Sequence, residues 1–215
     1  MKKDLVIFGA GGLGREILFQ MQVNKKFLEE YHILGFVDDT PDLLDKNVNG
    51  FKVIGNSNWL EQYPAVINTV ICLGNAQHRK MVAERLSKNK NIVFPTFIAD
   101  DVRISEEVAF GKGCIFCFSC IITVNISIGE FAVFNSDCTV GHDSRIGNYV
   151  TLYPSVNISG NVNIGDCSEI GVGTNVIQCR NIGNEVIIGA GSVVITDIPS
   201  KCTAVGIPAK PIKFH

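Results

Sequence analysis

From residue 98 to residue 194 an apolar side chain stands at every sixth position, and this register holds seventeen times without a break. The apolar positions are Ile98, Ile104, Phe110, Phe116, Ile122, Ile128, Phe134, Val140, Ile146, Leu152, Ile158, Ile164, Ile170, Val176, Ile182, Ile188 and Val194. The fourth residue after each is mostly small or β-branched, with Arg180 as the bulky exception. A period of six fits neither an α-helix nor an alternating strand, but it is a known period of parallel β-helices.

This period predicts short strands joined by corners, with three hexads closing one triangular coil. Seventeen hexads then give between five and six stacked coils, in which the apolar residue and the residue four positions later point inward. Glycine directly follows the apolar residue at Gly111, Gly129, Gly141, Gly147, Gly165, Gly171, Gly183 and Gly189. Because these glycines lie near the expected corners, we expect them to adopt the positive φ angles that glycine tolerates.

The first 94 residues follow a different pattern, in which short apolar runs alternate with helical segments. We expect strands at residues 5–8, 33–37, 66–73 and 92–94, and helices at residues 15–24 and 77–86. Strands that alternate with helices predict a small Rossmann-like parallel α/β sheet. Pro95 marks the junction, so we expect two domains, residues 1–94 and residues 95–215, the second being a β-helix with a short C-terminal tail.

The composition excludes several classes of partner. A net charge of −2 argues against a nucleic-acid surface, and the sequence has no apolar run of membrane-spanning length.

Cys114, Cys117 and Cys120 have a spacing that metal ligands use. Cys114 and Cys120 nevertheless fall in the inward position of the hexad, where cysteine acts as a small hydrophobic residue, so we expect no metal. Reduced cysteines and the lack of a signal peptide predict a cytoplasmic protein.

The sequence from Gly9 to Gly14 has the G-x-G-x-x-G spacing of a phosphate-binding turn. It follows an expected strand and opens an expected helix, whose free N–H groups attract anions. The candidate nucleotide-binding residues are Gly9, Gly11, Gly12, Gly14, Arg15, Asp38 and Asp39. The two aspartates end the second strand, where an acidic side chain can bind a ribose or a base. The alternative is a tight turn that binds nothing. The sheet is short for a dinucleotide site, so we favour a mononucleotide or a nucleotide sugar.

His142 is the one histidine inside the repeat, two residues after the inward Val140. The register places it near a corner and facing outward. Asp143 follows directly, and a carboxylate can orient an imidazole and support its positive charge. Because imidazole titrates near neutral pH, His142 is a candidate general base. The alternative is a solvated surface histidine without a role.

The segment 134–143 and the hexads around it resemble the bacterial sugar acyltransferases of the left-handed β-helix class. This is the sialic acid O-acetyltransferase family, which includes nucleotide-aminosugar N-acetyltransferases. The resemblance extends over nearly the whole chain, through the glycine turn and residues 35–39, 74–75, 188–194 and 206–210. It implies a homotrimer that transfers an acetyl group from acetyl-CoA to an amine or hydroxyl of a nucleotide-linked sugar, without a metal.

The resemblance also implies roles for individual residues. His142 is the general base, Asp143 orients it, and Asn135 binds the sugar. Gly74 and Asn75 join the glycine turn and the two aspartates in binding the nucleotide sugar. Acetyl-CoA is expected to lie along Thr151, Gly160, Val172, Ala190, Pro208 and Lys210. The chain departs from the family at Leu13 and Thr151, where histidines are common.

Four other functions stay open at this point. One is an O-acetyltransferase that acts on sialic acid or another sugar. A nicotinamide-dependent oxidoreductase would use the glycine turn and Asp38, but the N-terminal half is short for two βαβαβ units. A zinc enzyme of the γ-carbonic anhydrase type needs several converging histidines. A non-catalytic scaffold would carry a ridge of threonines or asparagines on its surface, and the sequence suggests none.

Overall fold

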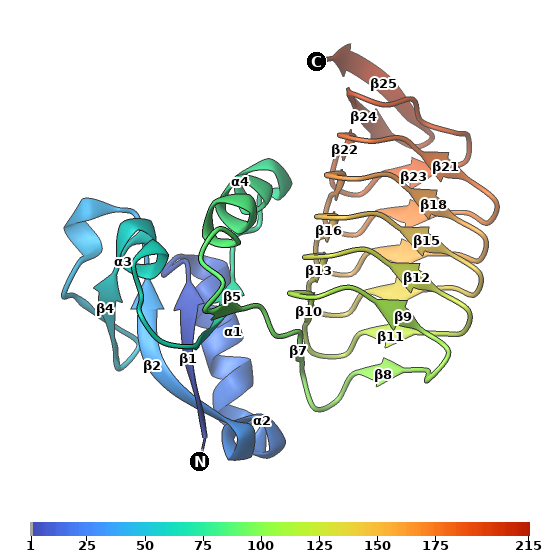
Figure 1. The fold of residues 1–215 in the computed structure, drawn as a ribbon. Helices are drawn as coiled ribbons and strands as arrows, with labels where there is room; N and C mark the ends of the chain where they lie inside the picture. Colours follow the sequence, from blue (N-terminus) through green and yellow to red (C-terminus); the bar gives the residue numbers. More distant parts are fainter. Residues whose placement is uncertain (1) are drawn as a thin grey trace. The chain divides into compact units, whose positions relative to one another are not determined.

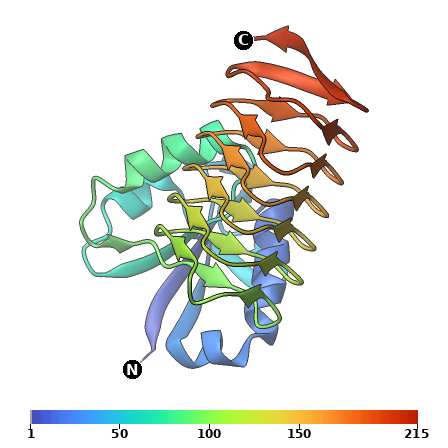
Figure 2. The same ribbon diagram turned by 90° about the vertical axis from the view of Figure 1, so that its right-hand side faces the viewer.

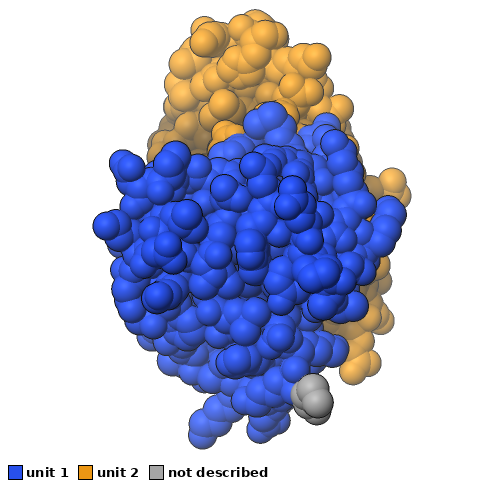
Figure 3. Space-filling model, turned by 60° about the vertical axis from the view of Figure 1, so that its left-hand side comes forward, with its two compact units in different colours: residues 1–74, 78–97 blue, residues 75–77, 98–215 orange. Residues whose placement is uncertain are grey.

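The computed structural model describes residues 2–215. They form two compact units, one of residues up to Gly74 together with residues 78–97, the other of residues 75–77 and 98–215 (Figure 3). No helix within residues 2–215 is long and apolar enough to cross a bilayer. The cytoplasmic location stays a prediction.

The first unit is an α/β domain built on one mostly parallel sheet, in the order β3-β4-β2-β1-β5-β6 (Figure 1). Its strands are β1 (Lys3–Phe8), β2 (Tyr31–Val37), β3 (Asn47–Val48), β4 (Phe51–Gly55), β5 (Ile67–Ile71) and β6 (Ile92–Val93). Its helices are α1 (Gly12–Val23), α2 (Lys25–Glu30), the 3-10 turn η1 (Pro41–Leu43), α3 (Ser57–Glu61) and α4 (Ala76–Leu86). The central β1 buries Leu5, Val6 and Ile7 completely, as expected for a parallel sheet covered on both faces.

The predicted parallel sheet is confirmed, but the prediction missed β3, β4, α2 and α3. Both missed helices are only one to two turns long, too short to show a helical period. Their start signals were present, because Asn24 and Asn56 each cap a helix by accepting a backbone N–H with the side chain. Helix α1 begins at Gly12 rather than at residue 15, because the end of the glycine turn forms its first turn.

The second unit is the predicted left-handed β-helix, in which each hexad contributes one two-residue strand (Figure 1 and Figure 2). The first face consists of β7 (Phe97–Ile98), β10 (Ile115–Phe116), β13 (Val133–Phe134), β16 (Thr151–Leu152), β19 (Glu169–Ile170) and β22 (Ile187–Ile188), and continues into the hairpin β24 (Cys202–Gly206) and β25 (Ala209–Phe214). The second face consists of β8 (Arg103–Ile104), β11 (Ile121–Ile122), β14 (Thr139–Val140), β17 (Asn157–Ile158), β20 (Asn175–Val176) and β23 (Val193–Val194). The third face consists of β9 (Ala109–Phe110), β12 (Ser127–Ile128), β15 (Arg145–Ile146), β18 (Asn163–Ile164) and β21 (Asn181–Ile182).

The inward positions of the hexads form one continuous core from Val108 to Ala209. The first coil is the exception, because its strands are outermost in their sheets and are covered from one side only. Phe110 accordingly keeps 39% of its surface exposed. It packs edge-on against Phe116, which stacks on Phe134 in the next coil. Cys114, Cys120 and Cys138 are fully buried in this core.

The expectation about the corner glycines is wrong. None of the eight glycines, all within the described part of the chain, has a positive φ. The third residue after the apolar one takes that conformation instead, as Asp137, Asp143 and Ser155 do. The glycines are needed because successive coils approach closely. A Cβ atom on Gly147 would lie 2.7 Å from the backbone nitrogen of Asp166 in the next coil.

The surface also carries the asparagine ridges that the sequence did not suggest, so that expectation is wrong as well. On the second face, Asn157 donates to Asn175 at 3.2 Å. On the third face, Asn163 donates to Asn181 at 2.9 Å. These side chains link stacked coils and satisfy one another's amide groups. They form rows along the stack of coils, on the two faces that meet at the corner of His142.

Candidate active site

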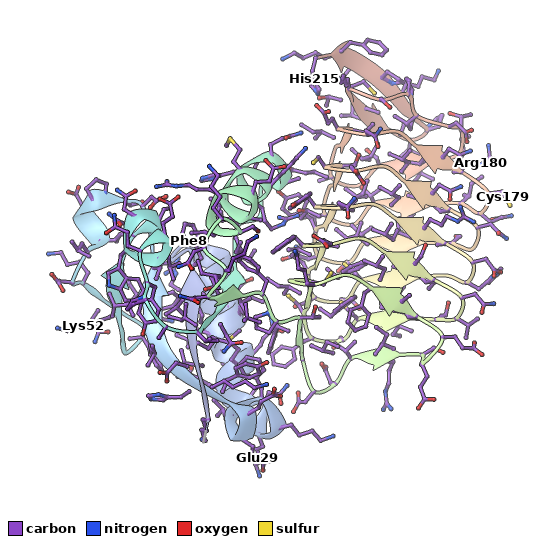
Figure 4. The ribbon with its side chains drawn as sticks, in the orientation of Figure 1. Phe8, Glu29, Lys52, Cys179, Arg180 and His215 are labelled. Atoms are coloured by element: carbon purple, nitrogen blue, oxygen red, sulfur yellow. The ribbon has the colours of Figure 1, made fainter. Side chains whose placement is uncertain are left out.

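His142 and Asp143 form the corner between β14 and β15, and two hydrogen bonds fix this corner to the neighbouring coils. The backbone nitrogen of Asp143 donates to the Val124 carbonyl at 3.1 Å, and that of Asn161 donates to the His142 carbonyl at 2.8 Å. Asp143 adopts a φ of +60°, which turns the chain and directs both side chains outward. The same corner two coils further on carries Cys179, at the outer edge of the β-helix in Figure 4.

The two side chains are joined, as the sequence predicts for an oriented base. Nδ1 of His142 lies 2.8 Å from Oδ2 of Asp143, and the side chains are 59% and 45% exposed. An ionised carboxylate only accepts hydrogen bonds, so this contact requires the proton on Nδ1. In the neutral ring Nε2 then carries the lone pair that can accept a proton.

Asp143 stays ionised at neutral pH. Its hydrogen bond from His142, followed by one from Asn125, holds its pKa below the usual range. The Asn125 amide nitrogen lies 3.2 Å from Oδ1 of Asp143. A hollow beside the corner is lined by Asn125, Ile126, Ser127, Asp143, Arg145 and Asn161. Asn125 was not predicted as a site residue, although its place 18 residues before Asp143, one coil period, was the available signal.

The four glycines of the N-terminal turn fall into two pairs. Gly9 has a φ of +101°, and a Cβ there would lie 2.8 Å from the Cys72 carbonyl oxygen. A Cβ on Gly14 would collide with the Gly9 carbonyl oxygen. Apart from the adjacent residues and the backbone of α1 itself, nothing in residues 2–215 lies within 4 Å of a Cβ placed on Gly11 or Gly12. Gly9 and Gly14 therefore shape the turn, while Gly11 and Gly12 leave open space at the N-terminus of α1.

The two predicted aspartates bind the protein's own backbone. Asp38 accepts hydrogen bonds from the backbone nitrogens of Ala10 and Thr40, both at 2.8 Å. Asp39 accepts the Ser57 backbone nitrogen at 2.7 Å and the Ser57 hydroxyl. Asp38 thus ties the glycine turn to the end of β2. Arg15 turns back toward the Gly11 carbonyl oxygen, at 3.3 Å from its Nε.

The carboxyl ends of β1, β2 and β5 surround a second hollow, which Phe8 marks in Figure 4. Its lining consists of Phe8, Asp38, Asp39, Thr40, Leu73 and His78. Ligands of open α/β sheets bind at this edge. His78 was not predicted as a site residue, because it stands on α4, outside the glycine turn.

The loop after β5 carries the predicted residues Gly74 and Asn75. The fully buried Arg79 donates to the carbonyl oxygens of Leu73 and Gly74. The Asn75 amide donates to a Glu169 carboxylate oxygen at 2.9 Å, and the Ala76 backbone nitrogen donates to the same oxygen. The sequence analysis missed both Arg79 and Glu169, which hold this loop.

The residues expected to contact acetyl-CoA do not form one patch in a single chain. Val172, which is 49% exposed, and Ala190 share the corner between the first and second faces. Gly160 is buried on the corner between the second and third faces, and Thr151 is fully buried in β16. Pro208 and Lys210 are exposed in the hairpin of β24 and β25.

The remaining predicted site residue, Asn135, is buried after β13, and its amide donates to the Leu152 carbonyl at 2.9 Å.

No group of three or more His, Cys, Asp or Glu side chains within residues 2–215 is arranged to hold a metal ion.

Comparison with known proteins agrees with this geometry. Residues 4–86 match the model of the PglD N-terminal domain family. No curated protein matches the sequence. The predicted resemblance to sugar acyltransferases of the left-handed β-helix class is confirmed by the fold and by solved structures that match nearly the whole chain.

One such structure is the acetyltransferase domain of PglB from Neisseria gonorrhoeae in complex with acetyl coenzyme A. It is 29% identical, with a TM-score of 0.88 over 99% of this chain and 100% of that chain. WeeI from Acinetobacter baumannii is 29% identical, with a TM-score of 0.84 over 98% and 100% of the two chains. PerB from Caulobacter crescentus, in complex with CoA and GDP-perosamine, is 25% identical, with a TM-score of 0.76 over 98% and 97%.

Asn125→Ala should raise the pKa of Asp143, because it removes a hydrogen bond that favours the ionised carboxylate. A carbon NMR titration of the Asp143 carboxyl group measures this directly. Ser127→Ala is the control, since Ser127 lines the same hollow, whereas the side chains that bond Asp143 are those of His142 and Asn125. An unchanged pKa in Asn125→Ala would contradict the assigned contact.

Gly11→Ala should leave the unfolding temperature unchanged but weaken binding of a nucleotide sugar, because the added methyl group enters only the open space of the turn. Gly14→Ala should lower the unfolding temperature, because its methyl group meets the Gly9 carbonyl oxygen. Thermal unfolding and calorimetric binding separate the two effects. Unimpaired binding by a folded Gly11→Ala variant would mean that the turn contacts no ligand.

Proposed function

We propose that this protein transfers the acetyl group of acetyl-CoA to the amino group of a nucleotide-linked sugar. The observation that carries this proposal is the hydrogen bond between Nδ1 of His142 and Asp143, which leaves Nε2 as the proton acceptor. It occurs on a scaffold that matches the PglB acetyltransferase domain over 99% of the chain. PerB, a neighbour at 25% identity, is described with GDP-perosamine, an amino sugar carried by a nucleotide.

In the proposed reaction, acetyl-CoA supplies the thioester carbonyl that the sugar amine attacks. His142 accepts a proton from the attacking nitrogen at Nε2 and becomes an imidazolium. The ionised Asp143 stabilises that positive charge and keeps the proton on Nδ1. As the new C–N bond forms, the C–S bond breaks, and His142 returns its proton to the departing thiolate. The products are an N-acetyl sugar and CoA with a free thiol.

The N-terminal unit is proposed to hold the nucleotide. Gly11 and Gly12 leave the first N–H groups of α1 accessible to phosphate oxygens. Asp38 fixes the turn in this conformation through Ala10. The hollow lined by Thr40 and His78 is proposed to take the base or the ribose. Gly74 and Asn75 are proposed to bind the nucleotide sugar, and Asn135 is proposed to bind the sugar.

Acetyl-CoA is proposed to bind along Val172, Ala190, Pro208 and Lys210, with its reactive end toward His142. Val172 and Ala190 lie on one corner of a chain and His142 lies on another. We therefore propose a homotrimer, in which the second chain brings its own corner to the cleft. Gly160 and Thr151 are both buried, so they are proposed to contact acetyl-CoA through the backbone.

His142→Ala should lower kcat by roughly 10²- to 10⁴-fold, the usual loss on removing a general base. Release of the CoA thiol from acetyl-CoA in the presence of nucleotide-linked amino sugars measures the rate. Because the acceptor is an amine, raising the pH should restore part of the activity of the variant by supplying free amine. The fold should persist, because the imidazole is 59% exposed and lies outside the core of the β-helix.

His32→Ala is the matched control, because His32 is also an exposed histidine paired with a carboxylate, Asp4, at 3.2 Å. It should keep full activity. Near wild-type kcat in His142→Ala at neutral pH would contradict the role of His142. Transfer of acetyl to no nucleotide sugar by the unchanged protein would contradict the function itself.

A further inference from the structure

The imidazole of His142 lies against Gly160, which stands 18 residues later on the same corner of the next coil. A Cβ atom added to Gly160 would lie 2.5 Å from Nε2, 2.6 Å from Cε1 and 3.0 Å from Cδ2 of His142. Ordinary contacts of a Cβ atom begin at about 3.4 Å. The ring therefore occupies the space that any other residue at position 160 would fill.

We propose that Gly160 is a positioning residue for the general base. Because Gly160 has no side chain, it leaves a space in which the imidazole of His142 lies, and we call this space the seat. This inference rests on the proposed function, because the seat matters for catalysis only if His142 is the base. The bond to Asp143 holds the ring at Nδ1 alone. The space at Gly160 adjoins Nε2, Cε1 and Cδ2, and the backbone of Gly160 stops the ring from moving further toward the next coil.

The fold itself does not need this glycine. Gly160 has no left-handed φ, so alanine is compatible with its backbone. A Cβ on Gly141 or Gly147 would meet the backbone of the next coil, which cannot move easily. At Gly160 the nearest atoms all belong to the His142 side chain, which is 59% exposed and free to swing outward. Alanine at position 160 should therefore displace the base and leave the coils in place.

The consequence for catalysis follows from the geometry of proton transfer. A base must lie within hydrogen-bond distance of the proton that it abstracts, and a misplacement of about 1 Å can cost on the order of 10²-fold in rate. To reach an ordinary contact with an alanine Cβ, Nε2 has to move by about that distance from its 2.5 Å separation. Gly160→Ala should therefore lower kcat by roughly 10- to 100-fold, with the KM for the nucleotide sugar unchanged.

A double-mutant cycle tests whether Gly160 acts through His142. Gly160→Ala should reduce kcat strongly in the wild-type background and have no further effect in His142→Ala, where the ring that it displaces is gone. An equal fold-reduction in both backgrounds would overturn the proposal, because Gly160 would then act on acetyl-CoA or on the fold independently of the histidine.

A measurement that needs no activity tests the seat separately from the proposed function. Nitrogen NMR of His142 should show a protonated Nδ1 bonded to Asp143 in the wild type, and Gly160→Ala should weaken or abolish that signature at an unchanged unfolding temperature. Gly147→Ala is the control, since it should lower the unfolding temperature but keep the signature. An unaltered His142 signature in Gly160→Ala would overturn the seat, whereas full activity of His142→Ala would contradict only the proposed base.

Discussion

The hydrogen bonding of each coil to the next is the constraint on which the rest of the β-helix depends. Backbone bonds such as that from Asn161 to the His142 carbonyl, at 2.8 Å, recur along the stack. Up to Val194 they align residues that stand 18 positions apart. Close alignment excludes side chains at the glycines beside the corners, and it brings residues from separate coils into contact. Asn125 meets Asp143, and His142 meets Gly160, for this reason alone.

Much of the fold could be predicted from the sequence, because the buried positions of the β-helix repeat with one period and one chemistry. The corner conformation could not. The residues with a positive φ include Phe131, Asp143, Tyr149 and Cys167. These side chains have no chemical property in common, because the neighbouring coils and not the residue type impose the turn. In the N-terminal unit, α2 and α3 were missed because helices of six and five residues owe their existence to caps and packing rather than to periodicity.

The candidate site likewise contains residues that could be predicted from the sequence and residues that could not. His142 and Asp143 could be recognised because they are adjacent in sequence. Asn125 and the seat at Gly160 lie one coil away, so they become visible only when the coil period is used as a distance. Asp38 and Asp39 show the opposite case, because the sequence suggests carboxylates that face a ligand, whereas both accept hydrogen bonds from the protein's own groups. Asp38 and Asp39 fix the glycine turn and the loops next to it.

The central claim is that the acetyl group is transferred to the amine of a nucleotide-linked sugar. The most direct test compares nucleotide-linked amino sugars with the same sugars in which a hydroxyl replaces the amine, using mass spectrometry of the sugar product after incubation with acetyl-CoA. The account predicts one added acetyl group on an amino sugar and none on its hydroxyl counterpart. Acetylation of the hydroxyl sugars at an equal or higher rate would contradict it.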